Sequence, residues 1–211
     1  EAAHGHTAAE AVRHLTREIC FTYLNRLVAL RLMEQRGLIP ESVARGRASA
    51  GFALFRRIAP GAFGEDVLRA YRHYLEALFD EVGEEVGVLF DRRTPGSLVF
   101  PDGATVDGVL EILSSPELDA AWQEDETIGW VYQYFTPREE RQAARQSQVP
   151  RNSYELAIRN QFYTPRYVVR FLVDNTLGRL WYEMRRGRTE LANRCTFMIR
   201  FPDELFLDGT A

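Results

Sequence analysis

The chain has 211 residues, of which 45% are hydrophobic and 27% charged, so it is long enough and apolar enough to form an ordinary folded core. No stretch approaches the roughly 18 consecutive apolar residues of a membrane-spanning helix, and the N-terminal residues lack the pattern of a signal peptide. The two cysteines, Cys20 and Cys195, lie far apart without metal-ligand spacing. We therefore expect a cytoplasmic protein with no membrane partner and no metal site.

The charges are unevenly distributed along the chain. All 26 basic residues are arginine, which excludes sites that need a lysine, such as the P-loop of nucleotide-binding enzymes. Residues 60–127 hold 16 acidic residues against four arginines, whereas residues 138–200 hold 13 arginines against six acidic residues. A basic later part fits a nucleic-acid partner, and two differently charged solvated faces would explain the pattern equally well.

The first expected element is a long amphipathic helix. Thr7 and Glu10 have the spacing of a capping box, which opens a helix, and Gly37 with Pro40 ends it. Apolar residues recur at three- and four-residue steps and predict one buried face: Val12, Leu15, Ile19, Tyr23, Leu27 and Leu30.

The middle of the chain is also predicted to be helical. Residues 44–64 are rich in Gly, Ala, Ser and Arg and are interpreted as a looser segment. A second helix is expected over 65–86, a loop over 91–103, a short helix over 106–113, and a new helical start at Ser115-Pro116. The second helix should turn these residues inward: Val67, Tyr71, Leu75, Leu78 and Val82.

The last third contains the expected domain boundary. The aromatic run 128–135 (IGWVYQYF) is interpreted as core, and Thr136-Pro137 should begin a polar helix that runs through Arg145. Residues 146–152 are polar and contain a proline, so we expect one domain over 1–150 and a second over 151–211. A long helix should run from Thr164-Pro165 to about Gly187, and 196–201 (TFMIRF) should form a strand.

The most informative motif is Gln161-Phe162-Tyr163-Thr164-Pro165. Thr164 can cap the following helix and Pro165 suits its first turn, so nearby backbone N–H groups are left to bind an anion. A carboxylate such as that of S-adenosyl-L-methionine would fit there, with the two aromatic residues as apolar walls. A Thr-Pro helix start is common, and capping alone explains most such pairs.

A second copy of the motif, residues 133–137 (QYFTP), tests this interpretation. The polar sequence REERQ follows the second copy and predicts a solvated helix. The 161–165 copy is followed by an apolar face that could pack against a sheet: Val168, Val169, Leu172, Val173, Thr176 and Leu180. We therefore assign the cofactor to the 161–165 copy.

The context of this motif resembles a known enzyme family. Residues 160–169 (NQFYTPRYVV) and 171–179 (FLVDNTLGR) are similar to the start of the methylase domain in gamma-class DNA adenine methyltransferases, especially those of the BREX and DISARM phage-defence systems. Residues 23–34 (YLNRLVALRLME) and 128–135 resemble the helical region ahead of that domain. The resemblance implies a mainly α fold: a helical N-terminal domain that leads into the first elements of an α/β methyltransferase fold.

The same resemblance implies methylation of adenine N6 in double-stranded DNA, with S-adenosyl-L-methionine as cofactor and other phage-defence proteins as possible partners. The family's glycine-rich cofactor loop and its Asn-Pro-Pro-Tyr tetrad are absent from the sequence, so no catalytic residue is assigned and these 211 residues alone should be inactive. The alternative is a non-catalytic helical domain that docks partner proteins or DNA.

Three arginines within four residues are the candidates for contact with DNA. Arg185, Arg186 and Arg188 stand together at the expected end of the long helix. Clustered arginines can neutralise phosphates, and they can equally bond the last carbonyl groups of the helix.

Overall fold

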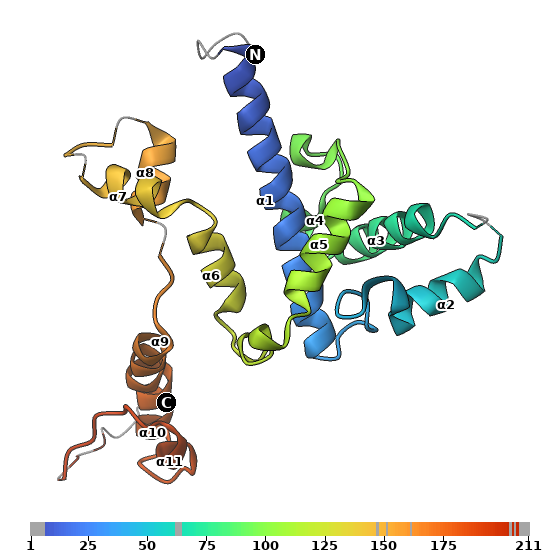
Figure 1. The fold of residues 1–211 in the computed structure, drawn as a ribbon. Helices are drawn as coiled ribbons and strands as arrows, with labels where there is room; N and C mark the ends of the chain where they lie inside the picture. Colours follow the sequence, from blue (N-terminus) through green and yellow to red (C-terminus); the bar gives the residue numbers. More distant parts are fainter. Residues whose placement is uncertain are drawn as a thin grey trace. The chain divides into compact units, whose positions relative to one another are not determined.

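The computed structural model describes residues 7–61, 65–146, 148–150, 152–160, 162–202, 204 and 206. Throughout these residues the secondary structure is helical, with no β-strand, which confirms the mainly α prediction (Figure 1). Contacts between Cα atoms divide the chain into two compact units, residues 1–150 and residues 151–211, and each unit is described by itself.

The first unit contains seven α-helices among its described residues: α1 (Ala8–Gln35), α2 (Ala50–Ile58), α3 (Val67–Gly83), α4 (Gly87–Phe90), α5 (Gly103–Leu113), α6 (Thr127–Tyr134) and α7 (Arg138–Gln146). Four short 3-10 turns join them: η1 (Gly46–Ala48), η2 (Pro95–Ser97), η3 (Pro116–Leu118) and η4 (Ala121–Gln123). The second unit contains α8 (Ser153–Asn160), α9 (Arg166–Val173), a π-helical turn η5 (Asp174–Gly178), α10 (Arg179–Met184) and α11 (Leu191–Arg194).

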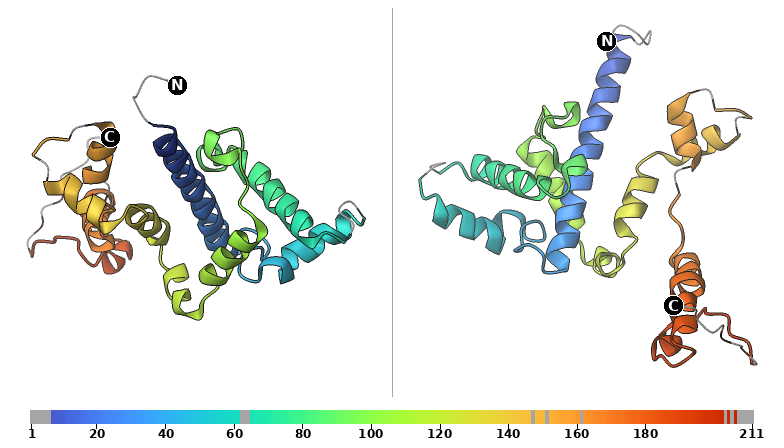
Figure 2. Two further views of the ribbon diagram at one scale, coloured as in Figure 1. Left: turned by 45° about the horizontal axis from the view of Figure 1, so that its top comes forward. Right: turned by 180° about the vertical axis from the view of Figure 1, so that it is seen from behind.

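Helix α1 is the central element of the first unit and is packed against η2, α4, α5, α6 and η4. Its capping box is confirmed, since the amide of Thr7 donates to Glu10 Oε2 at 2.7 Å and the amide of Glu10 donates to Thr7 Oγ1 at 3.3 Å. The predicted apolar face is buried only in its later part. Val12 and Leu15 are 63% and 40% exposed, because the first turns of α1 extend beyond the neighbouring helices (Figure 2).

The core of the first unit lies between α1, α3 and α5. The inward face predicted for the second helix is confirmed at the four buried positions, and the core consists mainly of these side chains: Tyr23, Leu27, Leu30, Phe52, Tyr71, Tyr74, Leu75, Leu78, Phe79, Val82, Phe90, Val106, Leu110 and Trp122. The looser segment predicted over 44–64 was wrong for residues 50–58, which form α2. Ser49 caps that helix. The ring of Phe52 packs edge-on against the ring of Tyr71, with 5.1 Å between the ring centroids.

A buried arginine joins α1 to the loop before α5. Arg26 is 1% exposed; its Nε donates to the carbonyl of Leu89 at 2.8 Å and its Nη2 to the carbonyl of Asp91 at 2.9 Å. Nη2 also donates to Ser97 Oγ at 2.7 Å. Burial lowers the pKa of this guanidinium, since water no longer solvates the charge. Arg26 therefore fixes the predicted 91–103 loop against the central helix.

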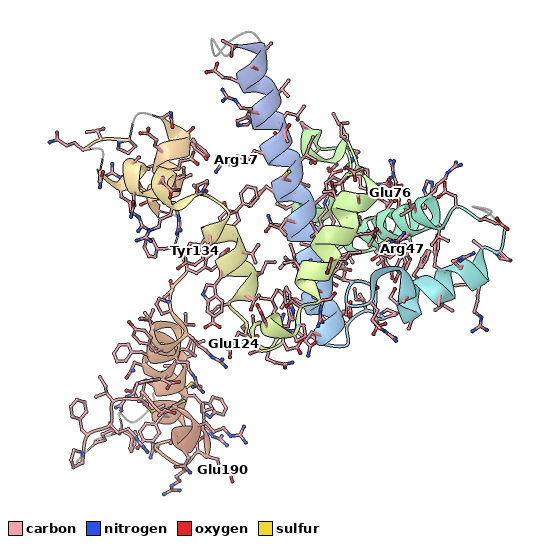
Figure 3. All side chains as sticks on the ribbon, in the orientation of Figure 1. Arg17, Arg47, Glu76, Glu124, Tyr134 and Glu190 are labelled. Atoms are coloured by element: carbon pink, nitrogen blue, oxygen red, sulfur yellow. The ribbon has the colours of Figure 1, made fainter. Side chains whose placement is uncertain are left out.

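The aromatic run 128–135 was predicted to be core, and this is wrong for three of its residues. Trp130, Tyr132 and Tyr134 are 44%, 41% and 60% exposed; Tyr134 is labelled on α6 in Figure 3. Ile128 and Val131 pack against the core instead. In a helix only residues three and four apart share a face, so a run of adjacent aromatic residues cannot all point inward.

The strand predicted over 196–201 is also wrong. These residues form turns and irregular backbone, with no strand assigned among the described residues. The apolar pattern is real, but a β-strand exists only through pairing with a second strand, and helix side chains take that place here.

Candidate cofactor and DNA interface

The 161–165 motif lies immediately before α9. Residue 161 is outside the described residues; Phe162, Tyr163, Thr164 and Pro165 are irregular and exposed, with Phe162 at 65% and Tyr163 at 46%. The helix begins at Arg166, and the amides of Val168 and Val169 donate to the carbonyl of Pro165 at 2.9 and 3.2 Å. Phe162 and Tyr163 thus precede the helix start in an exposed, irregular stretch of chain.

The capping role predicted for Thr164 is wrong. Pro165 occupies the N-cap position with φ −58° and ψ 143°, and no side chain caps the helix. A residue before proline is kept out of the helical region, so Thr164 lies one position too early for its hydroxyl to reach the first amides. The N-cap residue of α9 therefore makes no side-chain cap.

The long helix predicted to follow the motif is confirmed as a continuous helical run from Arg166 to Met184, in which Asp174–Gly178 form a π turn. One face of this run is covered by residues 191–202; Cys195 Sγ, for example, lies against Gly178. The other face carries large apolar side chains that are 44–69% exposed: Val169, Leu172, Val173, Leu177, Leu180 and Met184. The second unit thus presents an uncovered apolar helix face.

The second copy of the motif has a different environment. Thr136 is 6% exposed, and α7 behind it is a surface helix in which only Ala144 is buried. Arg141 of α7 lies over the ring of Tyr134 at 4.6 Å. A solvated helix after this copy agrees with the prediction from sequence.

The three candidate DNA-binding arginines lie on one exposed turn at the end of α10. Arg186 has φ 48° and Gly187 has φ 73°, so the chain reverses through two left-handed residues. The amides of Arg186 and Gly187 donate to the carbonyls of Glu183 and Tyr182, both at 2.9 Å. Backbone amides therefore already bind these last carbonyl groups of the helix. The arginine side chains are not needed to cap them. The guanidinium of Arg185 lies 5.3 Å from the Trp181 ring centroid, and Arg188 is exposed.

Sequence reasoning missed a polar cluster on the covered side of the helical run. Asp174 and Asn175 in the π turn, together with Arg179, hydrogen-bond to the backbone of residues 197–199. Arg179 also pairs with Glu204, and this ion pair lowers the pKa of the carboxyl group. The Asp-Asn pair was visible in the sequence as a polar interruption of an apolar helix, which is the one signal that could have identified it.

Three cavities among the described residues of the first unit contain none of the predicted site residues. A cavity of about 390 Å³ between α1, α3 and α5 is lined mainly by apolar side chains, including Leu24, Phe79 and Phe100. Among the described residues no group of three or more His, Cys, Asp or Glu side chains could hold a metal ion. In the same part of the chain no helix is long and apolar enough to cross a membrane.

Two curated proteins are similar to the chain, although no family model matches it. The adenine-specific methyltransferase BrxX of Escherichia coli O9:H4 (strain HS) is 26% identical over 205 residues, which cover 80% of this chain and 16% of that protein. The adenine-specific methyltransferase PglX of Lacticaseibacillus casei (strain Zhang) is 26% identical over 217 residues, which cover 85% of this chain and 17% of that protein.

These similarities support a distant relationship to adenine-specific methyltransferases of the BREX type, as the sequence motifs predicted. The chain spans about one sixth of the length of the two relatives that it matches.

Proposed function

We propose that the chain is the N-terminal part of a DNA adenine-N6 methyltransferase of a bacterial phage-defence system. The observation that carries the proposal is the similarity to two adenine-specific methyltransferases over 80% and 85% of the chain. Residues 1–150 form the helical N-terminal domain and residues 151–211 form the start of the methyltransferase domain. Methyl transfer to the exocyclic amine of adenine in double-stranded DNA requires residues outside this chain.

In this proposal the start of α9 contributes to the site for S-adenosyl-L-methionine. The first turn of α9 has no side-chain cap, and the amino end of a helix attracts a carboxylate. Phe162 and Tyr163 are exposed beside it and provide apolar surface for the rest of the cofactor. The uncovered apolar face of α9 and α10 suits a helix that packs on the sheet of an α/β domain.

Calorimetric titration of the parent enzyme with S-adenosyl-L-methionine tests the cofactor site. We expect Phe162→Ala to weaken binding about tenfold, since a lost aromatic contact is worth roughly 1–1.5 kcal/mol. The matched control is Tyr134→Ala, which removes the equivalent aromatic residue from the second copy; Tyr134 is 60% exposed, close to the 65% of Phe162. Unchanged affinity in Phe162→Ala, or an equal loss in both variants, would contradict this site.

DNA is proposed to contact the turn that ends α10. Arg185, Arg186 and Arg188 are exposed there, and phosphate contacts need an accessible guanidinium. The contact would position the duplex without selecting its sequence, because phosphates carry no base information.

A further inference from the structure

The irregular segment 196–201 is held along one edge by side chains of the helical run. Asn175 Nδ2 donates to the carbonyl of Phe197 at 2.8 Å, and Asn175 Oδ1 accepts from the amide of Ile199 at 2.9 Å. In a parallel sheet one residue makes this pair of bonds to the carbonyl and the amide on either side of the residue opposite it. The amide group of Asn175 therefore replaces a parallel-strand residue opposite Met198.

Other side chains continue the same edge. Asp174 Oδ2 accepts from the amide of Phe197 at 2.9 Å, and Arg179 Nη1 donates to the carbonyl of Ile199 at 3.0 Å. Glu204 Oε1 accepts from the amide of Phe201 at 2.9 Å. The backbone groups of alternate residues are thus satisfied as they would be by a neighbouring strand.

The opposite edge is open. Within the part of the chain that the structure describes, the carbonyl of Met198 and the amide and carbonyl of Arg200 have no hydrogen-bond partner, while the Met198 amide closes a turn to Cys195 at 3.2 Å. Phe197, Ile199 and Phe201 are 39%, 52% and 67% exposed. An open row of backbone groups beside exposed apolar side chains is a template for a further β-strand.

We infer that residues 196–201 are the docking edge for a β-strand from the part of the parent polypeptide outside these 211 residues, and that Asp174, Asn175 and Arg179 are positioning residues for that strand. The inference rests on the proposed function, which makes this chain part of a longer enzyme. In the two relatives more than four-fifths of the polypeptide lies outside the aligned region, so such a strand has an ample source. A strand in the same polypeptide also has a higher effective concentration than a second copy of the chain.

Amide-resolved hydrogen exchange, measured on the parent enzyme and on the 211-residue chain, tests the inference. We expect the Arg200 amide to exchange at least tenfold more slowly in the parent than in the 211-residue chain, whereas the Ile199 amide is protected in both. In the parent, Asn175→Leu removes both side-chain bonds to the segment and should speed exchange at Ile199 and Arg200 on the order of tenfold. Asn193→Leu, at an exposed asparagine of α11, is the control and should change neither rate.

Equal exchange of the Arg200 amide in the parent and in the 211-residue chain would overturn the inference. Protection that is present in the 211-residue chain and rises with its concentration would overturn it too, since the edge would then bind a second copy. Failure of the proposed function is distinguishable: the parent would then bind no S-adenosyl-L-methionine and methylate no DNA, whatever the exchange rate at Arg200.

Discussion

Replacement of Arg26 by methionine should destabilise the first unit by roughly 2–4 kcal/mol. The change keeps a long apolar side chain between Tyr23 and Phe79, over whose rings the guanidinium lies at 5.6 and 5.2 Å. It removes three hydrogen bonds from a charged donor, each worth about 1.5–3 kcal/mol. Part of that loss is offset, because a buried guanidinium costs several kcal/mol of desolvation.

Urea unfolding of the 211-residue chain, followed by circular dichroism, measures this effect as a shift in the transition that reports on the first unit. Arg45→Met is the matched control, since Arg45 pairs with Glu41 on the surface with 63% of its side chain exposed. Its loss should cost less than about 1 kcal/mol. A loss below 1 kcal/mol in Arg26→Met, or one no larger than in Arg45→Met, would refute the role given to Arg26.

Three further predictions follow from the geometry. In helix α5, Gly108→Ala should stabilise the chain by up to about 1 kcal/mol, since no atom lies within 4 Å of the added carbon. Gly178→Ala should destabilise the chain, because the added carbon would lie 3.0 Å from Cys195 Sγ, so thermal melts should shift in opposite directions for the two variants. Arg179 lowers the pKa of Glu204, so the stability contributed by this pair is full above about pH 4.3 and is lost as the pH falls through the lowered pKa. The difference in unfolding free energy between wild type and Glu204→Gln should therefore shrink in acid, and a constant difference would contradict the pairing. In the parent enzyme, Arg188→Ala should reduce the slope of log binding constant against log salt by about 1, and an unchanged slope would remove this residue from the DNA interface.

The helices could be predicted from sequence where capping residues and apolar spacing match the face that the structure buries. Thr7 with Glu10 fixes the start of α1, and the apolar spacing through Leu75 and Leu78 identifies the inner face of α3. Helix α2 was missed because the many Gly, Ala, Ser and Arg residues of 44–64 favoured a looser segment, although the helix itself is amphipathic. It owes its position to Phe52, which packs against aromatic residues distant in sequence.

The candidate site was only partly predictable. Similarity of motifs led to the relationship with adenine-specific methyltransferases, but the local capping argument chose the wrong residue, because Pro165 rather than Thr164 occupies the N-cap. The apolar pattern of 196–201 favoured a strand. No local sequence signal predicted that the side chain of Asn175 would bind the backbone of this segment. Long-range hydrogen bonds of this kind depend on the tertiary fold, which short-range patterns do not encode.

The most direct test of the central claim is a map of N6-methyladenine in genomic DNA from cells that carry the parent gene, compared with cells in which it is deleted. The account predicts methylation at one defined sequence motif that disappears on deletion. It also predicts that expression of residues 1–211 alone restores none of it. Identical N6-methyladenine maps with and without the parent gene, or restoration by the 211 residues alone, would contradict the account.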